Sequence, residues 1–181
     1  YDPLHDGHLE TVVLAKEHIE SIGNNKVIAG FVSSSHDTYV RRKNPGGVID
    51  YQRVHNNVIF AETSKHNQPV QWIFHDNYET LGIQHSLNFT DVIAYISKMV
   101  ETYVGQNIDI YYVFGSDNAG FAMAFTHGRQ DLAKAICIGR PGYSLTKETA
   151  ELISSDPNLS FVQGNNPLSS TLVRSLQTGP V

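Results

Sequence analysis

The sequence predicts an α/β protein in which a mostly parallel sheet is covered by helices on both faces. Short apolar runs rich in branched residues alternate with longer amphipathic segments, which is the pattern of such a sheet. No repeats or low-complexity tracts interrupt the alternation. With 181 residues, of which 40% are apolar, the chain can bury one sizeable core, and we expect a single domain over residues 1–181.

Amphipathic periodicity predicts the helices. The first helix begins near His8, follows an apolar stripe from Leu9 and ends near Gly23. Asp50 is expected to cap a second helix, which Gln68 and Pro69 break. Further helices are expected over residues 90–104, 117–125 and 146–153, and the last helix begins at Ser169.

The strands are expected over residues 27–32, 70–74, 108–114, 135–138 and 159–162, and a polar, basic loop over residues 33–47. Segments 33–43, 115–118 and 139–142 directly follow three of these strands. In a Rossmann-like parallel sheet, ligands bind outside the carboxyl ends of the strands. We therefore expect these three segments to form one ligand-binding rim.

Composition excludes several classes of protein. A net charge of −5 argues against a nucleic-acid binder held by bulk charge. Cys137 is the single cysteine, so a disulfide framework and a cysteine-based zinc site are excluded. No apolar run approaches the length of a membrane span. These features favour a cytoplasmic protein with small-molecule partners, and they leave open whether it forms a homo-oligomer.

The chain opens with YDPLHDGH, which places two histidines and a glycine at the start of a helix. Gly7 lacks a Cβ and lets the backbone approach a ligand, and we expect the unpaired amides at His8 and Leu9 to favour an anion. His5 and His8 can then donate to phosphate oxygens. The alternatives are two surface histidines near a cap, or half of a metal site. No zinc-ligand spacing is evident among the nine histidines, so we predict no protein-bound metal.

A second helix start, SSTLVR, lies near the other end of the chain. Ser169, Ser170 and Thr171 supply hydroxyl groups, and Arg174 supplies a guanidinium group. Together the two segments predict a nucleoside triphosphate held between two helix N-termini.

These two motifs, in this order, resemble the signatures of the HxGH nucleotidylyltransferase superfamily. The second matches the ISSTxxR pattern, with Leu168 in the isoleucine position. Within that superfamily the chain most resembles the nicotinamide or nicotinate mononucleotide adenylyltransferases. The supporting segments are residues 30–33, 37–39, 51–54, 77–79, 115–117 and 140–142. The family also places a strand just before the first motif, so we expect upstream residues that are absent from this sequence.

The resemblance implies that the 5′-phosphate of a mononucleotide attacks the α-phosphorus of ATP, which yields the dinucleotide and pyrophosphate. A phosphate monoester is already largely a dianion at neutral pH, so the reaction needs no general base. Positioning and positive charge should lower the barrier, with His5, His8 and Arg174 as the catalytic residues. Mg²⁺ is expected on the triphosphate, held largely by phosphate and water.

On the mononucleotide side, the resemblance implies that Arg42 or Lys43 meets the phosphate. Val40 intervenes after the tyrosine where the family has lysines, and a solvated loop is the alternative. Tyr78 and Glu79 resemble a Trp-Glu element that brackets the nicotinamide ring, or Tyr78 is an ordinary aromatic residue at a strand end. The resemblance places Thr90 near the same nicotinamide ring, and the alternative is that Thr90 caps the helix that begins there.

On the ATP side, the resemblance assigns nucleotide contacts to Gly7 and to the hydroxyls at Ser169, Ser170 and Thr171. Gly115 and Asp117 resemble an element that meets the ribose and adenine, although Asp117 could simply cap a helix. Arg140 lies near adenine or phosphates, or in a plain turn.

Other functions stay open from the sequence. The same chemistry could act on another phosphorylated acceptor, such as phosphopantetheine. The chain could also be a non-catalytic nucleotide sensor, a histidine-rich metal-binding domain or a purely structural domain. The sequence does not choose between nicotinate and nicotinamide, since that choice rests on one or two contacts.

Overall fold

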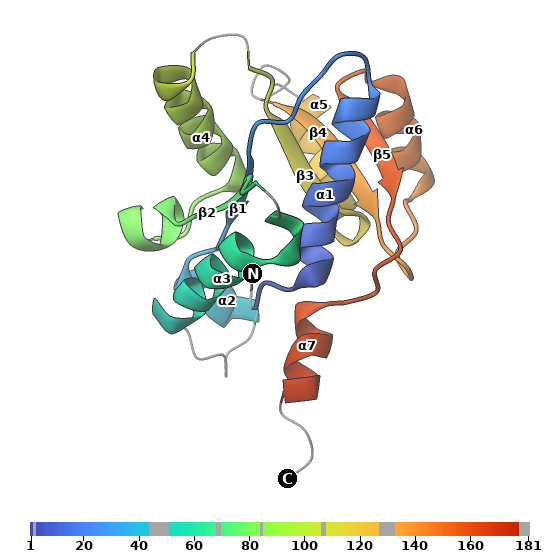
Figure 1. Ribbon diagram of the computed structural model, residues 1–181. Coiled ribbons are helices and arrows are strands. Elements are labelled where there is room, and N and C mark those ends of the chain that lie inside the picture. Colours follow the sequence, from blue (N-terminus) through green and yellow to red (C-terminus); the bar gives the residue numbers. More distant parts are fainter. Residues whose placement is uncertain are drawn as a thin grey trace. The chain divides into compact units, whose positions relative to one another are not determined.

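The computed structural model describes residues 1, 3–43, 51–67, 70–83, 85–105, 108–126 and 133–177 (Figure 1). Its contacts divide the chain into two compact units, and each is described by itself. The first unit comprises Tyr1–Glu10, Asn25–Asn88 and Leu168–Val181. The second comprises Thr11–Asn24 and Phe89–Pro167.

The first unit is built on two parallel strands, β1 (Gly30–Ser33) and β2 (Ile73–Asp76), in register from Gly30 opposite Ile73. Helix α3 (Tyr51–Thr63) lies between them in sequence and packs against β2. Val32, Val54, Ala61 and Ile73 are buried in this unit. Its other elements are the first turns of α1 (Asp6–Ser21), α2 (Asp37–Lys43), the 3₁₀ turn η1 (Lys65–Asn67), the π-helical η2 (Tyr78–Ile83) and α7 (Ser170–Gln177).

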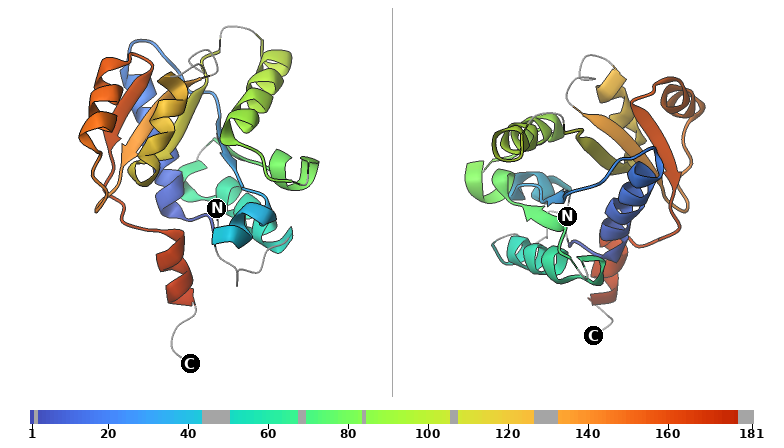
Figure 2. Two further views of the ribbon diagram at one scale, coloured as in Figure 1. Left: turned by 180° about the vertical axis from the view of Figure 1, so that it is seen from behind. Right: turned by 45° about the horizontal axis from the view of Figure 1, so that its top comes forward.

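The second unit contains a parallel three-stranded sheet in the order β3 (Tyr111–Gly115), β4 (Lys134–Gly139), β5 (Leu159–Gln163). β4 is the central strand and is buried from Ala135 to Gly139, because both of its edges and both of its faces are covered. Figure 2 shows α1 on one face of this sheet, with α5 (Ala122–Thr126) and α6 (Lys147–Ser155) on the other. The unit also holds α4 (Phe89–Tyr103) and the 3₁₀ segment η3 (Ser116–Phe121).

An aromatic cluster forms much of the core beneath this sheet. Phe125 is fully buried, and the Phe89 ring stacks on Tyr112 with a centroid distance of 4.9 Å. Because aromatic rings bury large apolar areas, this cluster can hold α4 and α5 against β3.

The predicted fold class is confirmed: the described strands are parallel, and helices cover the faces of the larger sheet. The strands form a two-stranded and a three-stranded sheet, whereas one sheet was expected. Periodicity identifies strands but does not determine which strands pair, since pairing depends on contacts far apart in sequence.

The predicted loop over residues 33–47 is wrong in part, because Asp37–Lys43 forms helix α2. Asp37 lies in the first turn and three basic residues lie in the last, an arrangement that the helix dipole favours. Val40, which interrupts the polar run, is the buried residue of this helix. The predicted cap at Asp50 and the break at Gln68 and Pro69 lie outside the described residues.

Candidate functional site

The loop that carries the two histidines is held by its own hydrogen bonds. The amides of His8 and Leu9 donate to the His5 carbonyl oxygen at 2.9 and 3.3 Å. The Gly7 amide donates to Nδ1 of His5 at 3.1 Å. The amides of His8 and Leu9 were expected to be unpaired and to favour an anion, and the structure shows that both are already satisfied within the first turn. An anion at this helix start would therefore meet side chains and the helix dipole.

The imidazole rings of His5 and His8 stack with their centroids 3.8 Å apart. Nδ1 of His5 accepts from Gly7, and Nδ1 of His8 accepts from the His5 amide at 3.3 Å, so each neutral ring carries its proton on Nε2. His8 is half-buried, while His5 is buried together with its Nε2 atom. His8 is thus the more accessible donor, and the buried ring of His5 packs against one face of the His8 ring.

The structure brings the two sequence motifs together within the first unit. Ser170, at the start of α7, donates to the Pro3 carbonyl oxygen at 3.0 Å. A Cβ added to Gly7 would lie 3.3 Å from Cβ of Leu168, the residue that precedes the serine pair. Segments from opposite ends of the chain therefore pack at the start of α1.

Helix α7 has its own internal contacts. Ser169 caps it, since its hydroxyl accepts from the Leu172 amide at 3.0 Å. The Arg174 guanidinium donates to the Thr171 hydroxyl at 3.2 Å. Arg174 therefore lies one turn from Thr171 on the helix that Ser170 ties to Pro3.

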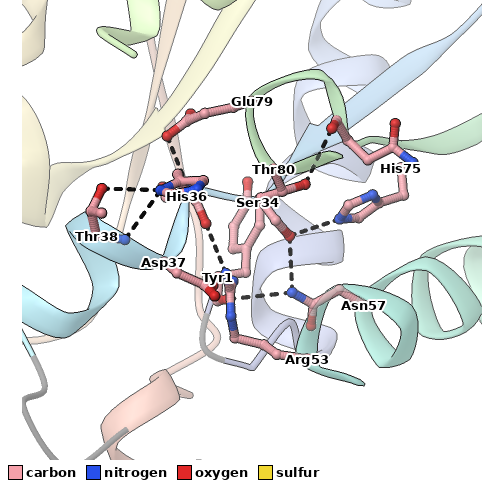
Figure 3. Close-up of polar contacts among 12 residues, drawn as sticks. Tyr1, Ser34, His36, Asp37, Thr38, Arg53, Asn57, His75, Glu79 and Thr80 are labelled. Carbon is pink, nitrogen blue, oxygen red and sulfur yellow. Dashed lines mark hydrogen bonds and ion pairs between the residues drawn. The ribbon is translucent and has the colours of Figure 1, made fainter. Parts of the chain in front are cut away.

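Arg53, a buried residue of α3, holds the backbone on both sides of the site (Figure 3). Its guanidinium donates to the carbonyl oxygens of Tyr1 at 2.7 Å and Ser35 at 2.8 Å. It also pairs with the Asp37 carboxylate at 3.0 Å. This fork joins the segment before the histidines to the segment after β1.

Asn57 lies one helical turn after Arg53 and is 1% exposed. Its Oδ1 accepts from the Leu4 amide at 2.9 Å, and its Nδ2 donates to the Ser34 hydroxyl at 2.9 Å and the Tyr1 carbonyl at 3.3 Å. The Ser34 hydroxyl in turn lies 2.7 Å from Nε2 of His75 (Figure 3). Burial lowers the pKa of His75 to about 4, helped by the charge of Arg53, so this ring is neutral near pH 7.

Of the predicted mononucleotide residues, Glu79 lies at the start of α2. The buried carboxylate of Glu79 accepts from the His36 amide at 2.8 Å, and Nδ1 of His36 accepts from the Thr38 amide at 3.2 Å. His36 thus caps α2, and Glu79 secures His36 (Figure 3). Because a histidine is an uncommon cap, this helix start could not be predicted from its cap residue.

The remaining mononucleotide candidates are placed as follows. Tyr78 is half-buried, and its ring lies 3.2 Å from a Cβ added to Gly82. Arg42 and Lys43 are exposed in the last turn of α2, where Lys43 lies over the Tyr39 ring at 4.8 Å. Thr90 belongs to the second unit and is the second residue of α4, so it lies inside the first turn and not at the cap.

Three of the nucleotide-side candidates, Gly115, Asp117 and Arg140, lie at the carboxyl ends of β3 and β4 in the second unit. Arg140 donates to the Asp117 carboxylate at 2.9 Å, and its backbone amide donates to the Ser116 hydroxyl at 2.9 Å. Gly115 is packed closely, since an added Cβ would overlap the Asp117 carboxylate. Two of the three segments expected to form one rim, residues 115–118 and 139–142, thus meet at this sheet edge, whereas residues 33–43 belong to the first unit. Gly115 occupies the N-cap position of η3 and Asp117 lies inside its first turn, so Asp117 does not cap this segment.

Two further observations concern the described residues alone. No group of three or more His, Cys, Asp or Glu side chains among them is placed to hold a metal ion. None of the helices that the structure describes has both the length and the apolarity needed to cross a membrane.

Comparison with solved structures identifies the fold. The nicotinic acid mononucleotide adenylyltransferase of Plasmodium falciparum, complexed with APC, aligns with 96% of this chain and 78% of its own at a TM-score of 0.59 and 16% identity. The same enzyme complexed with NaAD aligns over the same shares at a TM-score of 0.57 and 16% identity. The chain has the fold of nicotinic acid mononucleotide adenylyltransferases. No family model and no curated protein matches its sequence.

Within this adenylyltransferase fold, sequence reasoning missed Ser34, His36, Asn57 and His75, and gave Arg53 no role. One signal could have found Asn57. It lies at helical spacing between Val54 and Ala61, both of which are buried, so a polar residue interrupts the apolar face of α3. A buried amide must be hydrogen-bonded, which predicts a structural partner for it.

Proposed function

We propose that the chain transfers the adenylyl group of ATP to the 5′-phosphate of nicotinate or nicotinamide mononucleotide. The observation that carries the proposal is the hydrogen bond from Ser170 to Pro3, because it joins the two phosphate-binding motifs in one compact unit. The shared fold with nicotinic acid mononucleotide adenylyltransferases supports it.

The proposed chemistry follows from charge and position. The attacking phosphate is largely a dianion near pH 7, and the substrates together carry several negative charges. The Nε2–H group of His8 would donate a hydrogen bond to a triphosphate oxygen, and the His5 ring, stacked on that of His8, would hold it in place. Arg174 would add a fixed positive charge from α7. These groups would favour the in-line transition state without removing a proton.

The other candidates bind the two substrates in this proposal. Ser170 and Thr171 would meet triphosphate oxygens, with Ser169 capping their helix. Gly115, Asp117 and Arg140 would meet the adenosine part, where the carboxylate can accept from ribose hydroxyls. Arg42, Lys43, Tyr78, Glu79 and Thr90 remain proposed contacts of the mononucleotide. Gly7 would serve by close packing against Leu168.

Mg²⁺ would neutralise charge on the bound triphosphate. In this proposal the ion would be held largely by phosphate oxygens and water. Its contribution would be electrostatic, and the protein would supply the donors and the alignment.

The test is an assay of pyrophosphate release from ATP with nicotinate mononucleotide, nicotinamide mononucleotide or phosphopantetheine as acceptor. We expect turnover with one or both mononucleotides. Turnover with phosphopantetheine alone would show that phosphopantetheine, and not a mononucleotide, is the acceptor of the adenylyl group. Binding of ATP without turnover with any acceptor would indicate a nucleotide sensor and overturn the proposal.

A pair of histidine variants tests the site itself. His8→Ala should lower kcat by about a hundredfold, because it removes the accessible donor. His55→Ala changes an exposed histidine of α3 and should leave kcat within about twofold. Equal kcat values for the two variants would remove His8 from the reaction.

A further inference from the structure

We propose that Asn57 is a positioning residue for His5 and His8. It acts by fixing the loop that carries them against the end of β1. The activity readout of this inference rests on the proposed function, while its structural readout does not.

The contacts of Asn57 connect three separate segments. Its side chain binds the backbone of Tyr1 and Leu4, the second of which directly precedes His5. The same side chain binds Ser34, the first residue after β1. With 1% exposure, Asn57 has no water to replace a lost partner, so each of these bonds constrains the loop.

The polarity of the network is determined by its backbone members. An amide N–H can only donate, so the Leu4 bond requires Oδ1 of Asn57 on its side, which turns Nδ2 toward Tyr1 and Ser34. The Ser34 hydroxyl, having accepted from Asn57, can donate to Nε2 of the neutral His75 ring. Every step from Leu4 to His75 is therefore a donor facing an acceptor.

Such a network can restrain the two histidines through a short covalent path. His5 follows Leu4 directly, its carbonyl accepts from the His8 amide, and its ring stacks on His8. A shift of Leu4 would therefore move both rings. Because donors must lie within a fraction of an ångström of their productive positions, such a shift should reduce transition-state stabilisation.

Asn67 provides a matched control in the same unit. It is also buried, at 3% exposure, and it also joins two backbone groups: it donates to the Ala61 carbonyl and accepts from the Ile73 amide at 2.9 Å. These contacts connect the end of α3 to β2 and do not include the histidine loop. Asn67→Ala should thus cost stability in a similar way without altering His5.

The experiment compares Asn57→Ala, Asn67→Ala and the unchanged protein in kcat, in the KM for ATP, in Tm and in the NMR signals of the histidine rings. Both variants should have a lower Tm. We expect Asn57→Ala to lower kcat by about tenfold or more, with KM within about threefold, and Asn67→Ala to keep kcat. The ring signals of His5 and His8 should move in Asn57→Ala alone.

The outcomes separate the two proposals. Equal kcat values for the two variants would overturn the positioning role. A fall in kcat/KM that comes entirely from a higher KM for ATP would also overturn it. If the unchanged protein turns over no mononucleotide, the proposed function fails. The ring signals then decide the positioning role, which is overturned if both variants move them equally or neither does.

Asn57→Asp keeps the inference testable if Asn57→Ala does not fold. It retains Oδ1 for Leu4 but replaces the Nδ2 donor by an oxygen facing the Tyr1 carbonyl and Ser34. We expect the same loss of kcat at pH 8 and partial recovery at lower pH, where the protonated carboxyl can donate again. A pH profile parallel to that of the unchanged protein would overturn the role.

Discussion

The Ser170 hydroxyl donates to the Pro3 carbonyl oxygen at 3.0 Å and so joins residues 167 positions apart in the chain. This bond connects the start of α7 to the loop before His5. It holds the starts of α1 and α7 together within the first unit. Ser170 is therefore the residue of α7 whose substitution tests this arrangement most directly.

Ser170→Ala should lower kcat by about tenfold, because α7 loses its bond to the histidine loop and the proposed triphosphate site loses a hydroxyl. The Tm should fall only slightly, since one partly buried hydrogen bond contributes about 1 kcal/mol. Ser175→Ala is the control: Ser175 lies in the same helix and donates to the Leu172 carbonyl within it. A similar loss of kcat in both variants would show that the helix, and not the Pro3 bond, matters.

Gly7→Ala should reduce turnover by about tenfold or more. The added Cβ would lie 3.1 Å from the His5 ring and 3.3 Å from Leu168, so that the ring or α7 must shift. Steady-state kinetics with a Tm measurement would check this. Gly120→Ala serves as the control, because its added Cβ has nothing within 4 Å. Unchanged kinetics in Gly7→Ala would show that the packing here is not tight.

The pKa of His75 predicts how stability depends on pH. Burial lowers this pKa from 6.5 to about 4, so the folded ring binds fewer protons than the unfolded ring between these values. Its contribution is complete above pH 6.5 and declines as the pH falls, by about 2 kcal/mol between pH 7 and 5.

Urea denaturation at pH 7 and at pH 5 would measure this decline. His75→Gln removes the titrating ring, so its free energy of unfolding should fall less over the same interval. Parallel pH profiles for the two proteins would mean that His75 titrates normally when folded.

Asp117→Asn should raise the KM for ATP by about tenfold, since it weakens both the ion pair with Arg140 and the proposed acceptor for ribose hydroxyls. Stability should change little, because partly exposed ion pairs contribute at most about 1 kcal/mol. Asp109→Asn breaks the exposed Asp109–Lys134 pair in the same unit and should leave KM unchanged. An unchanged KM in Asp117→Asn would remove this carboxylate from the nucleotide site.

The Cys137 thiol should react with a thiol-specific disulfide reagent at pH 8 only after unfolding. The side chain is 1% exposed in central strand β4, and burial, with the Asp117 charge, raises its pKa to about 12. Titration of the thiol in native buffer and in guanidinium chloride would show the contrast. Rapid reaction in native buffer would indicate that β4 opens readily.

Periodicity predicted the strands of both sheets to within a few residues. It missed α2, because the helix is short, its cap is His36 and its one buried residue, Val40, gives no periodic signal. The start of α1 also differs from the expectation, because the His5 carbonyl oxygen already accepts from the amides of His8 and Leu9, which were expected to favour an anion. The cap at His36 is a side-chain hydrogen bond and the turn at His5 is made by backbone hydrogen bonds, and a hydrophobic pattern encodes neither.

By itself the sequence determined the α/β class, the parallel strands and the positions of the two motifs that we propose bind phosphate, because these depend on local spacing and residue type. Only the tertiary structure decided that Ser170 meets Pro3, that Glu79 supports His36 and that Asn57 joins Leu4 to Ser34. The physical reason is that each of these bonds is made between segments far apart in the chain, and it forms only after the core has brought its donor and acceptor together.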